Sequence, residues 1–316
     1  MIKEGSYYLR NPDVVIVSTA DRYLYVDANG LVTERTVTTP DNWSQLMRRL
    51  MVPIRGDDLH DLLEDTLEIG IDEVSPLVQE GLLIEAATPG ELEGRRDNLL
   101  TNNQAYYLSQ GEQKCEHLVV GITGSIVAGL MAPVILSLCY SGFQTKIDLI
   151  LTEAALRFVQ RDLFEYYGID TWVSAFERRD GIHVPHIALG HSADCVLVMP
   201  ASASSCHRLA NGASSDLLSM TVAATKAPVV VAPVMSTEMW EHRPVQRNLQ
   251  QLRDDGMYVI EPTLIFSAAG LVHQNDPMYG GPGTFWRGGL GVMQTLSAVM
   301  AHHQRKSDLH SDVDRR

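Results

Sequence analysis

The sequence predicts an α/β protein in which a parallel sheet with helices on both faces is preceded by a small winged-helix-like α+β domain. From residue 117 onward, short apolar β-prone runs alternate with segments of helical periodicity. Because the runs are almost wholly apolar, they fit strands buried on both faces, and helical crossovers between such strands give a parallel sheet. This is the Rossmann-like, or flavodoxin-like, arrangement. The runs are HLVVGI (117–122), KIDLILT (146–152), DCVLVMP (194–200), APVVVAP (227–233) and MYVIEP (257–262).

Residues 1–86 are predicted to form the small domain, which opens with strands. Residues 14–18 and 23–26 are β-prone, and Asn29-Gly30 supplies the positive φ angles of a tight hairpin turn before residues 31–37. These segments predict two or three short antiparallel strands.

Helices and a last strand follow in the same domain. Apolar residues recur at helical spacing in two successive segments, and a third helix is expected at 72–80. Gly81 offers a left-handed cap before the strand-like residues 82–86. A hairpin followed by helices and a strand resembles a winged helix. The periodic residues are Trp43, Leu46, Met47 and Leu50, then Leu59, Leu62 and Leu63.

The rest of the chain divides by composition. Residues 87–114 turn polar without sustained periodicity and predict a linker, and residues 115–303 form the C-terminal domain. Residues 304–316 are predicted to be a solvated tail. Residues 274–289 are rich in glycine and aromatic side chains, which fits either a lid over a bound peptide or a loop before the last helix.

Charge and composition narrow the class of partner. A formal net charge of −14 argues against nucleic acid, because phosphate backbones are bound by clustered Lys and Arg. No signal sequence is visible, and no segment reaches the ~18 apolar residues that span a bilayer, so we expect a cytoplasmic protein without a membrane partner. The expected partners are peptides or small molecules. The four cysteines, Cys115, Cys139, Cys195 and Cys206, lie far apart and suggest reduced packing residues and no metal site.

A loop suited to an anion follows the first strand of the predicted sheet. Gly121, Thr123, Gly124 and Ser125 lead from this strand into a helix. Glycines there allow close backbone approach, and the free N–H groups of the first helical turn attract an anion. A tight strand-to-helix turn explains the same residues equally well. Thr152 ends the next strand and offers either a second hydroxyl on the same rim or a helix N-cap.

Four blocks in order carry a specific resemblance: GITGSIVA, LILTEAALRFV, VPHIALGHSADCVLVMPASASS and APVMSTEMW, followed by NLQQLRDDGMYVIEP. Together they resemble the homo-oligomeric flavin-containing cysteine decarboxylases, which include phosphopantothenoylcysteine decarboxylases and lantibiotic peptidyl-cysteine decarboxylases. The similarity runs from His117 to Pro262. It implies FMN as the cofactor and a homotrimer, or a multiple of trimers, with FMN at subunit interfaces. Residues 1–86 resemble a PqqD-like module that recognises leader peptides, with a plain N-terminal extension as the alternative.

The resemblance also assigns roles to individual residues. It implies that His186, in the Pro-His-Ile block, is the catalytic histidine; an imidazole can take and return a proton near neutral pH. His183 and His191 have no such support and are interpreted as ordinary histidines. For Met235, Met239 and Trp240, ordinary core packing is the alternative to the roles given next. The implied cofactor-binding residues are Gly121, Thr123, Gly124, Ser125, Thr152, Pro200, Ala201, Ser202, Ala203, Ser204 and Met235, and the implied substrate-binding residues are Ser236, Met239 and Trp240.

The chain departs from the family pattern at two positions. Relatives carry asparagine where this chain has Ser204 and Ser236. A carboxamide donates and accepts with a longer reach than a hydroxyl, so decarboxylation is in question at these positions while flavin binding is not. No cysteine follows Cys206, so the reduction of the enethiol carried out by coenzyme A-type members is not expected.

Three functions remain open from the sequence. The first is FMN-dependent oxidative decarboxylation of the C-terminal cysteine of a ribosomally made precursor peptide to an aminoenethiol, with that peptide as partner. The second is a phosphopantothenoylcysteine decarboxylase-type enzyme of coenzyme A synthesis. The third is a non-catalytic flavoprotein scaffold or regulatory subunit. The N-terminal module and the missing cysteine favour the first.

Overall fold

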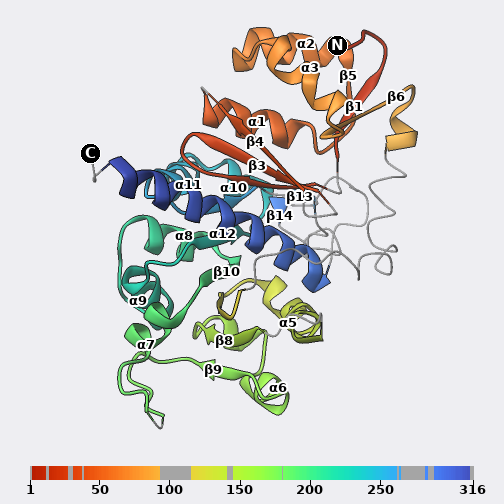
Figure 1. Ribbon diagram of the computed structural model, residues 1–316. Helices are drawn as coiled ribbons and strands as arrows, with labels where there is room; N and C mark the ends of the chain where they lie inside the picture. Colours follow the sequence, from red (N-terminus) through yellow and green to blue (C-terminus); the bar gives the residue numbers. More distant parts are fainter. Residues whose placement is uncertain are drawn as a thin grey trace. The chain divides into compact units, whose positions relative to one another are not determined.

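The computed structural model describes residues 2–11, 14–27, 31–37, 39–92, 115–140, 145–179, 181–261, 263–264, 282–283 and 288–313. The chain divides into two compact units, Met1–Tyr106 and Tyr107–Arg316 (Figure 1). We call them the N-terminal and the C-terminal unit and describe each by itself. The predicted turn at Asn29-Gly30, most of the predicted linker and most of residues 274–289 lie outside the described residues.

The N-terminal unit contains two groups of antiparallel strands. The meander expected from the sequence is present, with Val15 opposite Val26 and Arg22 opposite Thr36. A second group, which the sequence did not predict as a whole, places the first strand between two later ones. The meander is β2 (Val15–Ser18), β3 (Arg22–Val26) and β4 (Val32–Thr36), and the second group is β1 (Tyr7–Arg10), β5 (Ile54–Arg55) and β6 (Leu83–Ala86).

The predicted helices of the N-terminal unit are confirmed. They are α1 (Pro40–Arg49), α2 (Gly56–Asp61) with its π-helical continuation η1 (Leu62–Leu67), and α3 (Ile71–Gln79). Gly81 has a φ of 72°, as a left-handed cap requires. The periodic residues, including Trp43, Leu46 and Leu59, are buried together in one hydrophobic cluster. Within it, Trp43 Nε1 donates to the Tyr25 hydroxyl at 2.8 Å.

The C-terminal unit is built on the parallel sheet that the sequence predicts. Each neighbouring pair runs parallel, in the order β12-β11-β10-β7-β8-β9. The strands are β7 (His117–Ile122), β8 (Lys146–Leu151), β9 (Asp170–Trp172), β10 (Cys195–Ala201), β11 (Val229–Pro233) and β12 (Tyr258–Ile260). All but β9 coincide with a predicted apolar run.

The strand order contains one reversal of direction. The chain passes from β7 through β8 to β9, returns to pair β10 with β7 on its other side, and continues outward to β11 and β12. This is the order of doubly wound nucleotide-binding folds. In such sheets ligands bind beyond the carboxyl ends of the strands at the point of reversal, which lies here between β7 and β10.

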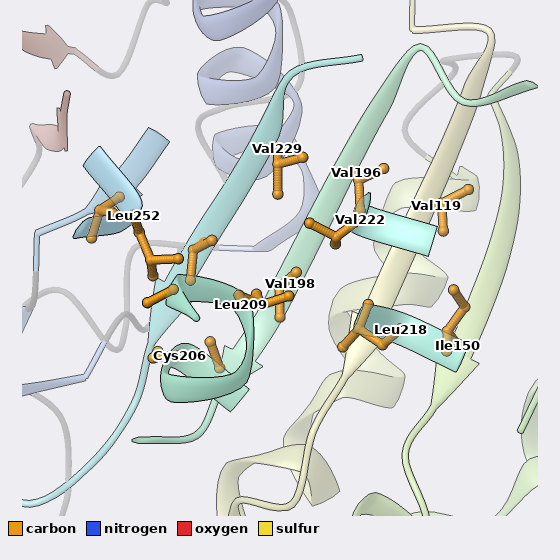
Figure 2. Close-up of a cluster of buried hydrophobic side chains, with 14 of the residues drawn as sticks. Val119, Ile150, Val196, Val198, Cys206, Leu209, Leu218, Val222, Val229 and Leu252 are labelled. Atoms are coloured by element: carbon orange, nitrogen blue, oxygen red, sulfur yellow. The ribbon is translucent and has the colours of Figure 1, made fainter. Parts of the chain in front are cut away.

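Helices cover both faces of this sheet. On one face, side chains of α8 (Ala203–Ala210), α9 (Leu217–Ala224) and α11 (Arg243–Asp254) pack against valines of the strands (Figure 2). Val119, Val196 and Val198 point to this face, and the intervening Val120 and Leu197 are equally buried. A fully buried side chain of this kind stabilises the fold by about 1.5–3 kcal/mol. On the other face α5 (Met131–Tyr140) packs against α12 (Gly288–Val313).

Three local features differ from the sequence-based expectation, in which residues 125–141 and 153–166 each form one helical segment and residues 304–316 form a solvated tail. The segment 125–141 divides into the 3-10 helix η3 (Ile126–Leu130) and α5, so Pro133 falls in the first turn of α5, where no amide hydrogen is needed. The segment 153–166 divides into η4 (Ala155–Arg157) and α6 (Arg161–Tyr166). The predicted tail from residue 304 onward is helical as far as Val313, with exposed side chains at 304–308.

Two further helices and a short strand pair belong to the C-terminal unit. α7 (Pro185–Ser192) lies between β9 and β10, and α10 (Thr237–Glu241) follows β11. β13 (Thr263–Leu264) pairs with β14 (Pro282–Gly283). Within the described residues, no helix has the length and apolar character needed to cross a bilayer.

Candidate functional site

Thr123 joins the two loops at the point of reversal. Its buried hydroxyl donates to Pro200 O at 2.6 Å and accepts from Ser202 N–H at 2.8 Å. The Thr123 N–H also donates to Pro200 O, at 3.3 Å. These contacts hold the loop after β7 against the loop after β10. The two loops at the point of reversal are therefore held together by contacts within the protein.

Gly121 and Gly124 are glycines because neighbouring elements leave no room for a side chain. A Cβ at Gly121 would lie 2.3 Å from Leu218 Cδ1, and one at Gly124 would lie 2.4 Å from Ala154 Cβ. The first contact lets α9 pack onto β7. The second brings the loop after β7 against the loop after β8.

The two predicted hydroxyls on this rim are used differently. Ser125 is half-buried and caps η3, with its Oγ accepting from Val127 N–H at 3.4 Å. Thr152 is buried; its hydroxyl donates to Ile122 O and accepts from Ala155 N–H, both at 3.3 Å. The backbone thus occupies the Thr152 hydroxyl, as the N-cap interpretation expects, whereas the Ser125 proton has no such partner among the described residues.

The block from Pro200 to Ser204 forms the turn from β10 into α8. Ser202 is the N-cap of α8 and accepts from Ser205 N–H at 3.3 Å. Ala201 O accepts from Val234 N–H at 2.9 Å, which links this turn to the loop after β11. Ala203 is half-buried and Ser204 is exposed.

The block after β11 forms the short helix α10. Ser236 caps this helix and accepts from Met239 N–H at 3.4 Å. Met235 and Trp240 are buried, whereas Met239 is 47% exposed. Nε1 of Trp240 is buried and has no hydrogen-bond partner in the described part of the chain.

His186 lies in the first turn of α7, directly after the buried Pro185. Because α7 returns the chain to the start of β10, its first turn is directed toward the carboxyl edge of the sheet. The buried Nδ1 of His186 has no partner among the described residues, and no hydrogen bond of that part of the chain joins His186 to the loops described above. His183 and His191 are exposed. The structure thus connects four predicted loops and leaves His186 separate.

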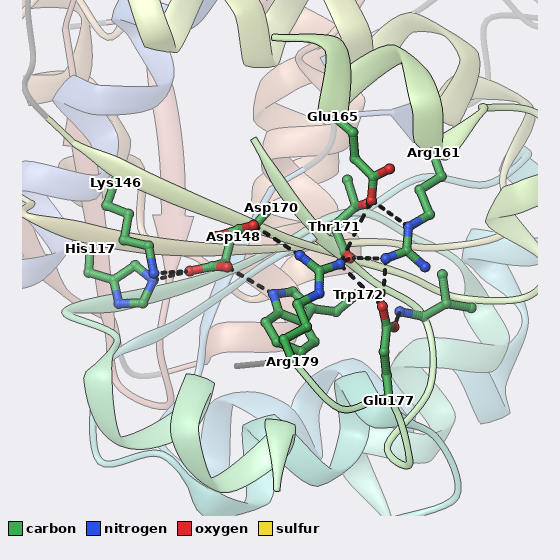
Figure 3. Close-up of polar contacts among 11 residues, drawn as sticks. His117, Lys146, Asp148, Arg161, Glu165, Asp170, Thr171, Trp172, Glu177 and Arg179 are labelled. Atoms are coloured by element: carbon green, nitrogen blue, oxygen red, sulfur yellow. Dashed lines mark hydrogen bonds and ion pairs between the residues drawn. The ribbon is translucent and has the colours of Figure 1, made fainter. Parts of the chain in front are cut away.

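Asp148 anchors a polar cluster on β8 that the sequence-based analysis missed. Its side chain is 1% exposed and accepts from Trp172 Nε1 at 2.8 Å, with His117 Nε2 at 2.6 Å and Lys146 Nζ at 2.9 Å (Figure 3). Burial alone would raise the pKa of this carboxyl, but the hydrogen bonds from His117, Lys146 and Trp172 outweigh it and lower the pKa to about 2. Only an aspartate in the middle of an apolar run signals this cluster in the sequence.

Arg179 braces the chain between β9 and α7. Its guanidinium lies 4.2 Å from the centre of the Trp172 ring, 2.9 Å from Asp170 Oδ1 and 3.2 Å from Glu177 Oε1 (Figure 3). Arg161 of α6 also contacts Glu177, at 2.5 Å. The segment that leads into the helix of His186 is therefore fixed by several polar contacts.

The cysteines are free and suited to packing. Burial raises the pKa of Cys206 and of Cys115 to about 12, and it also raises the pKa of Cys195 well above its usual value. The exposed Cys139 also has a raised pKa, because its thiol is partly desolvated. None is a thiolate near neutral pH, so none is poised as a nucleophile.

Comparisons with known proteins point to one family. A family model described as Flavoprotein matches residues 107–276, which is more than half of the 316-residue chain. The coenzyme A biosynthesis bifunctional protein CoaBC of Mycobacterium tuberculosis is 38% identical over 148 residues, which are 46% of this chain and 34% of that protein. Mersacidin decarboxylase from a Bacillus species is 30% identical over 154 residues, covering 49% of this chain and 77% of that protein. The chain thus spans about a third of the length of its CoaBC relative.

Similar solved structures include the FMN-dependent cysteine decarboxylase SpaF, with 28% identity and a TM-score of 0.48, covering 60% of this chain and 97% of that one. MrsD from a Bacillus species has 25% identity and a TM-score of 0.46, covering 60% of this chain and 96% of that one. The family match over residues 107–276 confirms the prediction of a flavin cofactor. The chain belongs to the flavoprotein family, in which mersacidin decarboxylase is one of its relatives.

Proposed function

We propose that this protein binds FMN at the carboxyl edge of its parallel sheet and decarboxylates the C-terminal cysteine of a ribosomally made precursor peptide to an aminoenethiol. The observation that carries the proposal is the Thr123 hydroxyl, which holds the loops after β7 and β10 together at the point of reversal. The residues that resemble the family's cofactor and substrate blocks occupy this edge of the sheet.

The residues at this edge fit FMN. Ser125 is the N-cap of η3, and its hydroxyl proton has no acceptor among the described residues and suits a phosphate. Gly124 lets this loop pack closely against Ala154 in the loop after β8, which sets the path of the backbone around the proposed phosphate position. Ser202, Ala203 and Ser204 would lie along the flavin ring, with Pro200, Ala201 and Met235 beneath them. Thr152 supports the rim through its backbone contacts.

His186 carries the proposed proton transfer. FMN, when bound, supplies an acceptor for the hydride that leaves Cβ of the substrate cysteine. His186 takes the thiol proton, which leaves a thioaldehyde next to the carboxylate. Loss of carbon dioxide then moves the bonding electrons through the thioaldehyde to its sulfur atom, which gives an enethiolate. His186 returns its proton to this sulfur to give the enethiol. The net change is loss of one carbon dioxide and two hydrogens.

The substrate carboxylate would be held by the block after β11. The Ser236 hydroxyl accepts from Met239 N–H and donates to the Glu238 carboxylate, so on binding its hydrogen bond would be transferred from Glu238 to the substrate carboxylate. Ser204 is exposed on the first turn of α8 and offers a second hydroxyl. A bridging water would fill the space that the family's longer carboxamides occupy. Met239 would border the cysteine end of the peptide, whereas Trp240 is fully buried in the hydrophobic cluster and would support that position from the core.

The N-terminal unit is proposed to recognise the leader of the precursor, as a PqqD-like module does. Support comes from the order α1, β5, α2, α3, β6, which is that of a winged helix. The β5-β1-β6 group adds a small antiparallel sheet. On this proposal the domains are residues 1–86 for recognition, 87–114 as linker and 115–303 for FMN.

A homotrimer, or a multiple of trimers, is proposed as the assembly. Large apolar side chains are exposed in the segments that follow β7, β8 and β9, which fits contact between copies. Tyr166 is 87% and Phe176 is 89% exposed. The others in these segments include Ile126, Leu130, Phe158 and Ile187. Sedimentation showing a monomer that binds FMN would contradict this assembly.

A phosphopantothenoylcysteine decarboxylase-type activity is the second candidate. The identity of 38% to CoaBC favours it, since mersacidin decarboxylase reaches 30% over a similar stretch. Against it stand the N-terminal unit and the absence of cysteine from residues 207–316.

Anaerobic incubation of the FMN-loaded protein with two substrates separates the candidates. A Cys-terminated peptide should bleach the flavin absorbance and lose one carbon dioxide and two hydrogens by mass spectrometry, whereas phosphopantothenoylcysteine should not. The reverse result would establish the second candidate. Flavin that neither substrate reduces would indicate a scaffold or regulatory subunit.

A further inference from the structure

A chain of hydrogen bonds runs from the N-cap of α8 to the start of α9. Ser202 Oγ lies 3.1 Å from Ser205 Oγ, and Arg208 Nη2 donates to Ser205 Oγ at 3.3 Å. Arg208 Nε lies 3.3 Å from Asp216 Oδ2, and Asp216 Oδ1 accepts from Ser219 N–H at 2.8 Å. One end of the chain is thus a residue of the candidate site, and the other is a carboxylate fixed by its own helix cap.

The direction of the bond between the two serines follows from counting donors and acceptors. A guanidinium only donates, so Ser205 Oγ must accept from Arg208. If the Ser202 hydroxyl also donated to Ser205, the Ser205 proton would be left unpaired, since no other acceptor for it exists among the described residues. Ser205 is 3% exposed, where an unpaired hydroxyl is costly. Ser205 therefore donates to Ser202.

This direction means that the proton of the Ser202 hydroxyl is left to donate. Its oxygen already accepts from Ser205 N–H at 3.3 Å and now accepts from the Ser205 hydroxyl as well. Both lone pairs are used, and its proton has no acceptor in the described part of the chain. Ser202 is half-buried at the end of β10, beside the point of reversal, so the proton is available to a ligand there.

We propose that Arg208, acting through Ser205, is a positioning residue that makes Ser202 an obligate hydrogen-bond donor to an acceptor atom of the flavin ring. This rests on the proposed binding of FMN, with its phosphate at Ser125 and its ring along residues 202–204. The ring's oxygen and nitrogen acceptors carry more negative charge in the reduced flavin, so a fixed donor strengthens binding of that form more than of the oxidised form. Ser202 thereby raises the reduction potential of the cofactor.

The test measures FMN bound to the full chain without substrate. Ser202→Gly removes the donor, while glycine remains a tolerated N-cap. We expect the ratio of affinities for reduced and oxidised FMN to fall roughly tenfold, which corresponds to about 30 mV in the two-electron potential. Arg208→Met should lower the potential less. Without the Arg208 donor, the hydrogen bond between Ser202 and Ser205 can run in either direction, so Ser202 remains free to donate to the flavin part of the time. Ser202→Thr and Arg208→Lys each keep a hydrogen-bond donor at their position, so both should leave the potential close to that of the wild type.

Control and contrary outcomes separate this inference from the proposed function. Arg247→Met, at an exposed position of α11, should leave the potential unchanged. A wild-type protein that takes up no FMN would end the proposed function and this inference together. Bound FMN with unchanged potential in both Ser202→Gly and Arg208→Met would overturn the inference alone. An equal loss of affinity for both redox forms of FMN would also overturn the inference. It would mean that Ser202 contacts the phosphate or only stabilises the fold.

Discussion

Gly124 and Ala154 meet so closely that the loops after β7 and β8 leave space for only one methyl group between them. A Cβ on Gly124 would lie 2.4 Å from Ala154 Cβ and 3.3 Å from the Ala154 carbonyl carbon. Because the second contact involves backbone, the loop cannot yield by rotating a side chain. The path of the proposed phosphate loop is thus set by a pair of small residues in the loops that follow two neighbouring strands.

Gly124→Ala should displace this loop and reduce retention of FMN at least tenfold. The physical reason is the overlap of the two Cβ atoms, which overpacking of this kind resolves by backbone shifts that cost about 1–3 kcal/mol. Flavin content per chain after gel filtration measures the effect. Gly124→Ala combined with Ala154→Gly removes the closest overlap and should recover part of the flavin. A single variant with full flavin content would show that the phosphate does not lie at this loop.

Ser125→Asp should abolish FMN retention while leaving the fold intact. Aspartate caps a helix as well as serine does, so η3 is preserved, but its fixed negative charge would face the phosphate dianion. Ser125→Asn is the matched control, because it has the same shape and cap without the charge. We expect the asparagine variant to keep most of its flavin. Equal flavin content in the aspartate variant and the wild type would move the phosphate elsewhere.

The sequence predicted the sheet because its buried strands are apolar runs, and it allowed a candidate site to be proposed because the motif residues directly follow those runs. β9 and α7 were missed, since β9 has three residues and opens with the exposed Asp170. The contact between Thr123 and Pro200 could not be predicted, because it joins residues 77 positions apart. Periodicity reports which face of an element is buried and carries no information on such long-range hydrogen bonds. The Asp148 cluster was missed for the same reason.

Asp148→Asn should destabilise the protein in a pH-dependent way. The folded-state pKa of Asp148 is lowered to about 2, so its contribution is fully present above the unfolded pKa near 4 and is lost as pH falls toward 2. We expect the free energy of unfolding at neutral pH to fall by about 2.5 kcal/mol, measured by urea titration. The difference from wild type should shrink between pH ~4 and ~2.

Asp170→Asn is the control for this prediction, since Asp170 is an exposed carboxylate on the neighbouring strand. Its effect on the free energy of unfolding should stay below about 1 kcal/mol, as for an exposed ion pair. A difference between wild type and Asp148→Asn that does not change with pH would mean that the asparagine acts through packing and that the Asp148 charge is not stabilising.

His186→Asn should stop turnover of a Cys-terminated precursor while leaving bound FMN in place. His186 sits on α7, and its buried Nδ1 has no partner in the described part of the chain, so its removal leaves no acceptor or donor unpaired there. Asparagine keeps a polar group of similar size but cannot exchange a proton near neutral pH. His191→Asn, at an exposed position of the same helix, should keep full activity.

Mass spectrometry of the products then distinguishes what the two serines do. If Ser204 and Ser236 orient the substrate carboxylate, the wild type removes one carbon dioxide and two hydrogens, and His186→Asn removes neither. Loss of two hydrogens alone in the wild type would mean that serine at these positions uncouples oxidation from decarboxylation. In that case Ser236→Asn should restore the loss of carbon dioxide, because a carboxamide donates to the carboxylate over a longer reach. A His186→Asn protein that turns over at the wild-type rate would remove the histidine from the proposed mechanism and leave the flavin site unaffected.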